Sequence, residues 1–257
     1  TIRRNVAQPS DGSPGNGDGP LALFFAPIIG HNTAGLSVTA TSVLAQGVGF
    51  RIDAGSTETA GVLPITLDEE TWNDVLAGVG NDNYAYDPET GAITAGSDGI
   101  IDFDLYPIAD TTLPPGNRGT VDIGSDNNST ADLSRQILHG LNASDLAYYG
   151  GEFRLDLTPI DLNGDTGLSA GIKDELTAII GLPRAIPIFS EVSGPGNNAT
   201  YTVVKFVGIR LLEVKLTGSN KFVMAQPATF VGSSVIKGSL TTTLTEDAIF
   251  APSTLVR

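Results

Sequence analysis

The chain has 257 residues, with 31 glycines, 15 prolines, no cysteine and a formal net charge of −15. A domain of this length can bury a large hydrophobic core without disulfides, and the lack of cysteine excludes thiolate metal sites and thiol nucleophiles. Because an acidic surface repels phosphate backbones and anionic headgroups, we expect neither nucleic-acid binding nor peripheral membrane binding. No stretch reaches the roughly 18 apolar residues of a membrane span.

The first residues predict a flexible segment, since Gly, Pro, Ser, Asn and Asp crowd positions 5–20. We therefore expect residues 1–20 to be a flexible N-terminal arm. Residues 21–257 are predicted to form a single β-rich globular domain, and a subdivision near 110–185 stays open.

Four short helices are expected further along the chain. Asp68, Ser129 and Ser169 can each accept hydrogen bonds from the free amides at the start of a helix, and each of the four predicted helices is followed by a glycine that can end it. The predicted helices are Asp68–Ala77, Ser129–His139, Asn142–Tyr149 and Ser169–Ile180.

Strands are predicted where β-branched and aromatic residues gather or where apolar and polar residues alternate. The predicted strands are Leu36–Thr41, Val48–Ile52, Ile100–Tyr106, Ile186–Val192, Thr200–Leu216 and Lys221–Val231. Helices and strands do not alternate regularly, as a doubly wound sheet would require. The pattern favours an α+β fold with a β-rich antiparallel sheet, sandwich or barrel and about four short helices.

The last two strands are expected to form the centre of the sheet, joined by the hairpin loop Thr217–Asn220. Thr200–Leu216 is long for one strand, so Gly208 is predicted to mark a bulge or a corner. In Ile100–Tyr106, Asp102 and Asp104 alternate with apolar residues and predict one solvated face. The residues of the central strand that we expect to be buried are Val204, Phe206, Leu212 and Val214.

A G-x-S-x-G pattern surrounds Ser169. A hydrolase nucleophile of this type follows a buried strand and precedes its histidine in the chain. Residues 163–166 are polar and predict a turn, and both His31 and His139 come before the serine. We therefore interpret Ser169 as a helix N-cap and both histidines as structural, with no hydrolase site.

The segment from Asp161 begins like a calcium loop. Asp161, Asn163 and Asp165 supply oxygens at alternate positions, as the first ligands of an EF-hand do. Thr166 stands where that loop needs glycine, and Ile172 stands where it needs a bidentate glutamate. A calcium site at these three residues and a tight turn leading into the next helix are both open readings, and no other cofactor is expected.

Asp98, Asp102 and Asp104 could gather with Asp122 or Asp126 into a second oxygen-rich site, or supply the two carboxylates of a glycosidase. Alternating aspartates on a strand are also typical of a solvated face, and nothing in the pattern selects a catalytic pair.

Arg118 lies between glycines in an acidic chain. We expect it to pair with a buried carboxylate and to fix its loop. Gly116, Gly119 and Gly124 are not followed by Lys-Ser or Lys-Thr, so the segment does not predict a phosphate loop.

Several segments together resemble a known family. Phe24–Gly30 followed by Leu36–Ser42 is similar to a stretch of TadG-like proteins of Tad (Flp) pilus assembly, in which an aromatic pair and a small loop precede a Val/Thr/Ala strand. The segments that resemble planctomycete-type members are Pro115–Gly124, Asn127–Thr130, Leu162–Gly167, Ile180–Arg184 and Ser193–Ala199. The resemblance covers most of the chain, about residues 20–230, and rests on the order and spacing of these segments.

The resemblance implies a non-enzymatic, extracytoplasmic protein of the cell envelope that helps to build or display adhesive pili. Its partners would be other envelope or pilus proteins, or a second copy of itself. Members usually carry an N-terminal anchor helix, so membrane attachment is expected only through a tether outside this chain. Two alternatives remain: a calcium-dependent surface or matrix subunit of the adhesin or S-layer kind, and, with less support, a carbohydrate-active enzyme.

Overall fold

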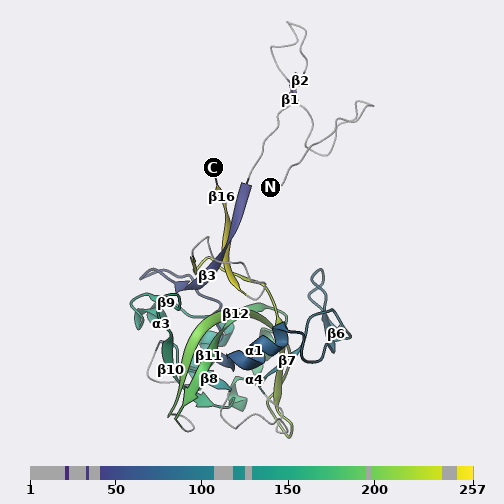
Figure 1. Ribbon diagram of the computed structural model, residues 1–257, viewed down its shortest axis with the longest axis vertical. Coiled ribbons are helices and arrows are strands. Elements are labelled where there is room, and N and C mark those ends of the chain that lie inside the picture. The colour runs from purple at the N-terminus through teal and green to yellow at the C-terminus, as the bar shows by residue number, and fades with distance from the viewer. Residues whose placement is uncertain are drawn as a thin grey trace. The chain divides into compact units, whose positions relative to one another are not determined.

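The computed structural model (Figure 1) describes residues 21–22, 33–34, 41–106, 118–124, 129–194, 198–238 and 248–256. The chain divides into two compact units, residues 1–44 with 253–257, and residues 45–252. In the first unit, β1 (Leu21–Ala22) pairs with β2 (Thr33–Ala34) in antiparallel fashion. The parts of our predictions that lie outside the described residues are the arm 1–20, His31, residues 36–40 of the first predicted strand, and Asp126.

Five strands of the second unit close into a small barrel (Figure 1). Their order is β10-β8-β4-β11-β12, and β12 pairs again with β10. The β4–β11 pair is parallel and the other four pairs are antiparallel. Closure pairs each of these five strands with two others of the barrel. The strands are β4 (Ile65–Asp68), β8 (Gly119–Val121), β10 (Ile160–Thr166), β11 (Pro183–Ser193) and β12 (Ala199–Lys215).

The two strands predicted to form the centre of the sheet differ: β12 has three neighbours and lies at the centre, whereas its hairpin partner β13 (Phe222–Pro227) lies next to the edge strand. The first residues of β12 pair with β10, its first two thirds pair with β11, and its last residues pair with β13. Strand β7 (Phe103–Tyr106) adds to the far side of β13. The hairpin loop predicted at Thr217–Asn220 is present, with Asn220 in the left-handed region at a φ of 55°.

Of the two features predicted for Gly208, the bulge is wrong and the corner stays a prediction. The β11–β12 register runs unbroken through the Gly208–Ala185 pair, and the shifts lie at Ile188–Phe189 and Leu211–Glu213 instead. Gly208 is needed for a close approach, because a Cβ there would lie 2.1 Å from the carbonyl oxygen of Ala228. Backbone carbonyls cannot move aside as side chains do, so only glycine fits.

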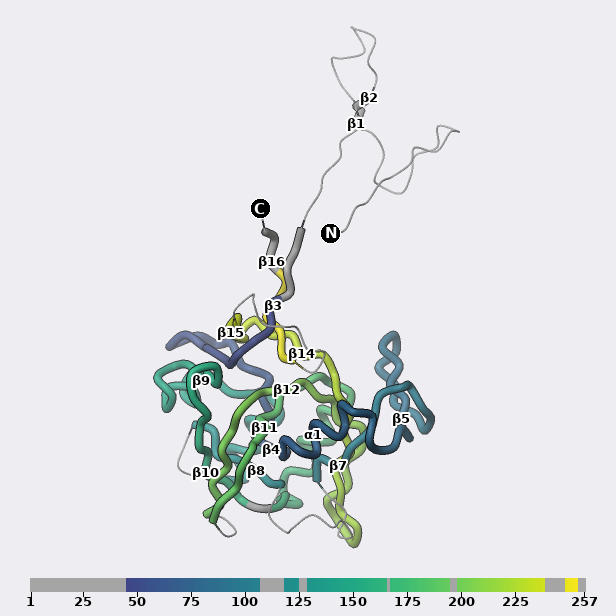
Figure 2. Tube along the Cα trace, viewed as in Figure 1, coloured from purple at the N-terminus to yellow at the C-terminus, as the bar shows by residue number. Residues whose placement is uncertain are grey.

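A second sheet and a hairpin complete this part of the fold. Its strand order is β14-β16-β3-β15, and β9 also pairs with β3. Hairpin β5–β6 projects beside α1 in the tube view (Figure 2). The strands are β3 (Thr41–Arg51), β9 (Glu152–Arg154), β14 (Phe230–Val231), β15 (Val235–Lys237), β16 (Ile249–Val256), β5 (Tyr84–Tyr86) and β6 (Ile93–Ala95).

The described part of the chain contains four α-helices, which with the antiparallel-rich sheets confirms the α+β class. They are α1 (Glu69–Leu76), α2 (Thr130–His139), α3 (Ala143–Ala147) and α4 (Lys173–Ala178), the last preceded by the 3-10 helix η2 (Ala170–Ile172). Asp68 accepts from the amide of Thr71 at 2.7 Å, and Asn142 forms a capping box with Asp145. None of the described helices is long and apolar enough to cross a membrane.

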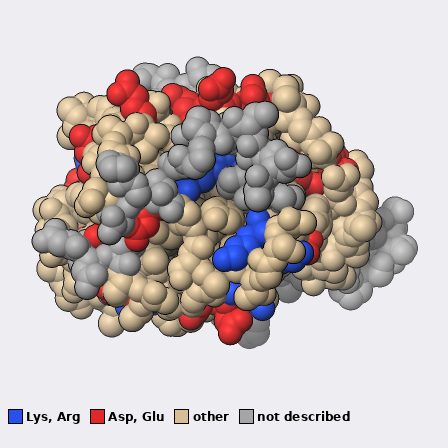
Figure 3. Space-filling model, turned by 90° about the horizontal axis from the view of Figure 1, so that it is seen from below, with Lys and Arg blue, Asp and Glu red and all other residues tan. Residues whose placement is uncertain are grey.

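The surface reflects the acidic composition. In the view from below (Figure 3), Asp and Glu lie around the margin of the face, and a small group of Lys and Arg lies near its centre. The chain has 14 Lys and Arg residues and 29 Asp and Glu residues. Most of the Lys and Arg residues are expected to find a carboxylate nearby.

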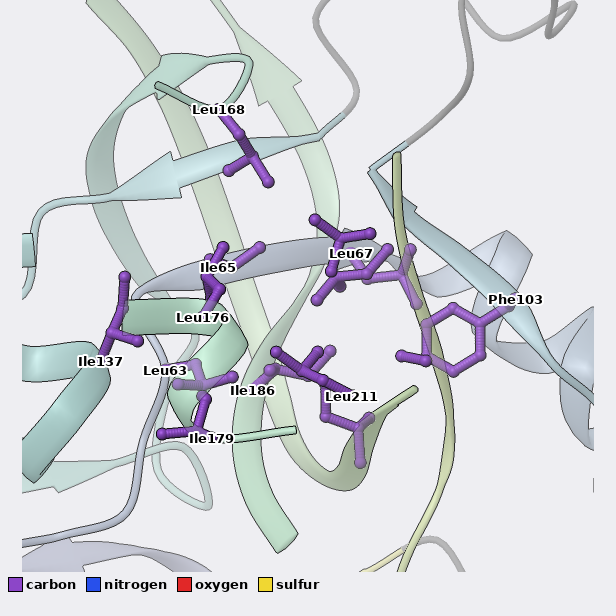
Figure 4. Packing of buried hydrophobic residues seen from close by; sticks show 14 of the residues in the cluster. Leu63, Ile65, Leu67, Phe103, Ile137, Leu168, Leu176, Ile179, Ile186 and Leu211 are labelled. Carbon is purple, nitrogen blue, oxygen red and sulfur yellow. The ribbon is translucent and has the colours of Figure 1, made fainter. Parts of the chain in front are cut away.

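Two hydrophobic clusters fill the second unit. In the first (Figure 4), Leu63 and Ile65 around β4 pack toward Ile137 of α2 and Leu176 of α4. The second contains an aromatic group in which Phe206 contacts the rings of Phe50 and Phe153, both centroids 5.0 Å away. Of the four residues that we expected to be buried, Phe206 and Leu212 are, whereas Val204 and Val214 are half-buried.

Candidate functional site

The three calcium candidates lie on a strand. Asp161, Asn163 and Asp165 occupy alternate positions of β10, so the turn predicted at residues 163–166 is wrong. The backbone there pairs with β8 on one side and β12 on the other, which holds even a polar sequence extended. Asp161 and Asn163 are exposed, and Asp161 accepts from the hydroxyl of Thr202 at 2.7 Å. Calcium binding at these residues stays a prediction.

The second acidic group is only partly assembled. Asp98 and Asp102 come together, but with Asp82 rather than with Asp122. Asp122 lies near Tyr149, and Asp104 lies near Arg118. Among the described residues, no group of three or more His, Cys, Asp or Glu is arranged to hold a metal ion.

The Asp82 and Asp102 carboxylates accept hydrogen bonds that fix the backbone around hairpin β5–β6. Asp82 accepts from the Ser97 hydroxyl at 2.6 Å, and Asp102 accepts from the amides of Asn83 and Tyr84 at 2.6 and 3.0 Å. Side-chain acceptors of this kind replace the backbone partners that a loop lacks. These aspartates therefore have a structural task.

Asp102 is buried, so the solvated face predicted for β7 is wrong at this position. Its side chain is 6% exposed, and its Oδ1 has no hydrogen-bond partner. Gln226 follows Ala225, which is the β13 partner of Phe103, and among the described residues its buried Oε1 also lacks a hydrogen-bond partner. Burial raises the pKa of Asp102, with smaller effects from the Asp82 and Asp98 charges.

This raised pKa predicts a pH dependence of stability. A carboxyl with a higher pKa in the folded than in the unfolded state, where it is about 3.9, binds its proton more readily when folded. The Asp102 carboxyl should therefore add stability as the pH falls from about 7 toward its unfolded-state pKa of about 4. In Asp102→Asn the change in stability from about pH 7 to about pH 5, measured by urea unfolding, should lack this contribution.

Asp82 provides the control, because the hydrogen bond from Ser97 lowers its pKa. Its protonation therefore changes the stability of the protein only below about pH 4. Asp82→Asn should keep the wild-type difference between the two pH values. An identical change between the two pH values in Asp102→Asn and wild type would show that Asp102 does not make this contribution.

Arg118 confirms its predicted role. Its buried guanidinium forms an ion pair with Asp68 at 3.4 Å and donates to the Thr71 hydroxyl at 2.9 Å and to the carbonyl of Asp104. It thereby joins the start of β8 to the first turn of α1 and to β7. Because its donors are occupied within the fold, Arg118 serves stability rather than binding.

Ser169 also matches its predicted role as a cap. Its hydroxyl accepts from the amide of Gly171 at 3.1 Å at the start of η2. Contrary to the expectation of a turn, a strand does precede it, but His139 lines a pocket that does not include Ser169.

One arginine differs from the others. Of the six described arginines, four pair with carboxylates: Arg51 with Glu152, Arg118 with Asp68, Arg135 with Asp145 and Arg154 with Asp156. Arg210 lies over the ring of Tyr86, 3.4 Å from its centroid. Arg184 has neither partner within the described residues. Its single hydrogen bond runs from Nη2 to the carbonyl of Leu138 at 3.3 Å, and its buried Nε has no acceptor.

Arg184 lines an open pocket of about 620 Å³, which we call the Arg184 pocket. Burial lowers the pKa of Arg184, because its charge is partly withdrawn from water. The lining comprises Thr59, Gly61, His139, Pro183, Arg184 and residues 229–234. It thus offers a cation, an imidazole and the hydroxyls of Thr and Ser residues.

The fold brings these segments together through close backbone contacts. Gly140 ends α2, and the following Leu141 pairs with Ala60, both amide-to-carbonyl distances being 2.8 Å. The amide of Ala185 donates to the Gly61 carbonyl at 2.9 Å, which places Arg184 beside the helix end. The Phe230 ring packs against Gly61, where a Cβ would lie 2.9 Å from it.

Apolar side chains stand at this pocket. Val231 lines it and is 49% exposed, while Leu138 and Leu182 immediately precede the lining residues His139 and Pro183 and are 37% and 47% exposed. The site therefore combines a partly buried cation with exposed apolar side chains in its lining or next to it in the chain.

No family model, no curated protein and no solved structure matches the chain.

Reasoning from the sequence missed this site. Its residues come from four separate segments, and Arg184 was noted only as part of a motif of the family resemblance. An arginine in an acidic chain is expected to have a specific partner, and this expectation predicts a role for Arg184 as it does for Arg118.

Proposed function

We propose that the protein is a non-enzymatic, extracytoplasmic component of cell-envelope assembly, related to Tad pilus biogenesis, that acts by binding other proteins. The observation that carries this proposal is the Arg184 pocket, which combines exposed apolar side chains with a cation that has no carboxylate partner among the described residues. Such a combination suits recognition of a polypeptide better than chemistry on a small substrate.

The ordered motifs that resemble TadG-like proteins support a place in the envelope. The acidic surface agrees with this proposal, since a net charge of −15 favours solubility and disfavours binding to nucleic acid.

A genetic experiment tests the proposal. Deleting the gene in its host should reduce the number of surface pili seen by electron microscopy and weaken adhesion. Complementation with the wild-type gene should restore both, whereas Leu138→Ser combined with Leu182→Ser should restore them only in part. Unchanged pili and adhesion after deletion would refute a role in assembly.

The calcium-dependent alternative makes a different prediction. Asp82, Asp102 and Asp161 already accept hydrogen bonds from the protein, so calcium would have to displace these donors. We expect the melting temperature to be the same, within about 1 °C, in calcium and in EDTA. A rise of several degrees in calcium that is lost in Asp161→Asn with Asp165→Asn would favour the alternative.

A further inference from the structure

We infer that the Arg184 pocket binds the side-chain carboxylate of an Asp or Glu within an extended, aliphatic segment of a partner protein. This inference rests on the proposed function and adds the chemistry of the partner.

The charge of the pocket selects a carboxylate. Apart from the bond to Leu138, the guanidinium of Arg184 has no acceptor among the described residues, and its Nε is buried. An unpaired, partly buried cation is stabilised most by an anion that accepts two parallel hydrogen bonds, which a carboxylate does. The chain carries 15 more negative than positive charges, so its field opposes polyanions, whereas a single carboxylate meets one local cation.

The surroundings select an extended, aliphatic segment. Strand β14 (Phe230–Val231) lies at one end of its sheet, so one of its edges is unpaired in the described structure, and residues 229–234 line the pocket. An extended peptide can add to such an edge. Because the pocket is open at the surface, a chain can pass across it, and Leu138, Leu182 and Val231 can contact aliphatic side chains beside the acid.

Peptide binding to the full chain tests the inference by isothermal titration calorimetry. The probe is acetyl-Val-Leu-Glu-Val-Thr-amide, and the same peptide with Gln in place of Glu is its matched control. Two further arms use acetyl-Val-Leu-Gln-Val with a free C-terminal carboxylate, and inorganic phosphate. The protein variants are Arg184→Gln, Arg184→Lys and, as a control distant in sequence, Arg154→Gln.

We expect the Glu peptide to bind the wild type and Arg154→Gln equally, and to bind Arg184→Gln at least about tenfold more weakly. Arg184→Lys should lie between them, because lysine keeps the charge and loses the bidentate geometry. The Gln peptide should bind the wild type at least about tenfold more weakly than the Glu peptide.

Equal binding of the Glu and Gln peptides to the wild type would overturn the inference, even if an Arg184 variant failed to fold. So would unchanged affinity in a folded Arg184→Gln. Tighter binding of the free C-terminus or of phosphate would overturn the choice of an internal side chain. Peptide binding is measured independently of the number of pili. The inference can therefore fail while the proposed function stands, and the proposed function can fail while the inference stands.

Discussion

Replacing Phe206 with alanine should lower the free energy of unfolding by about 3–5 kcal/mol. The ring is 7% exposed and makes edge-to-face contacts with Phe50 and Phe153, so its removal leaves a cavity between two aromatic side chains. The backbone of Phe206 belongs to β12 and pairs with Pro187 of β11, and this limits the collapse that could fill the space. Urea unfolding followed by circular dichroism measures the change.

Val231→Ala is the matched control, since this side chain is 49% exposed and should cost about 0.5 kcal/mol or less. A loss below about 1 kcal/mol for Phe206→Ala would mean that the aromatic group is not packed as described.

Gly208→Ala should destabilise the protein by about 3 kcal/mol or more, or prevent its folding. The added Cβ would lie 2.1 Å from the Ala228 carbonyl oxygen and 2.9 Å from the Phe230 amide nitrogen, both backbone atoms. Relief requires residues 228–230 to move away from β12, and this would break the hydrogen bond from the Ala228 amide to the Gly208 carbonyl. Thermal unfolding and yield of folded protein are the measurements.

Gly171→Ala is the control that tests whether the loss of stability is specific to the close approach of residues 228–230 to Gly208. A Cβ at Gly171 would meet only side-chain atoms of Thr130 and Ser169, at 3.1 and 3.3 Å. These can shift, so the cost should be about 1 kcal/mol or less. Similar losses at both glycines would argue against a backbone clash at Gly208.

Local signals in the sequence predicted the helices well. Asp68 and Ser129 each cap a helix as expected, because capping depends only on a side chain and on the amides two or three residues away. Strand β10 was missed for the opposite reason. Its residues 163–166 favour a turn, and only pairing with two distant strands makes them extended.

The burial of Asp102 and the site at Arg184 were not predictable from neighbours in the sequence. Asp102 alternates with apolar residues as a solvated residue would, and its burial follows from the covering hairpin β5–β6. The Arg184 pocket needs the end of α2, the start of β11 and the turn after β14 to meet. The sequence predicts that Arg118 pairs with a carboxylate, but it does not identify Asp68 as the partner.

The order in which the barrel strands leave the ribosome has a consequence for biosynthesis. Strands β4, β8, β10 and β11 are all made before β12, yet the barrel closes only when β12 pairs with both β10 and β11. Contacts between residues so far apart form slowly, and unpaired strands are prone to aggregation meanwhile. A nascent chain that ends before Ala199 should therefore need a chaperone, and it should become resistant to protease only after β12 has emerged.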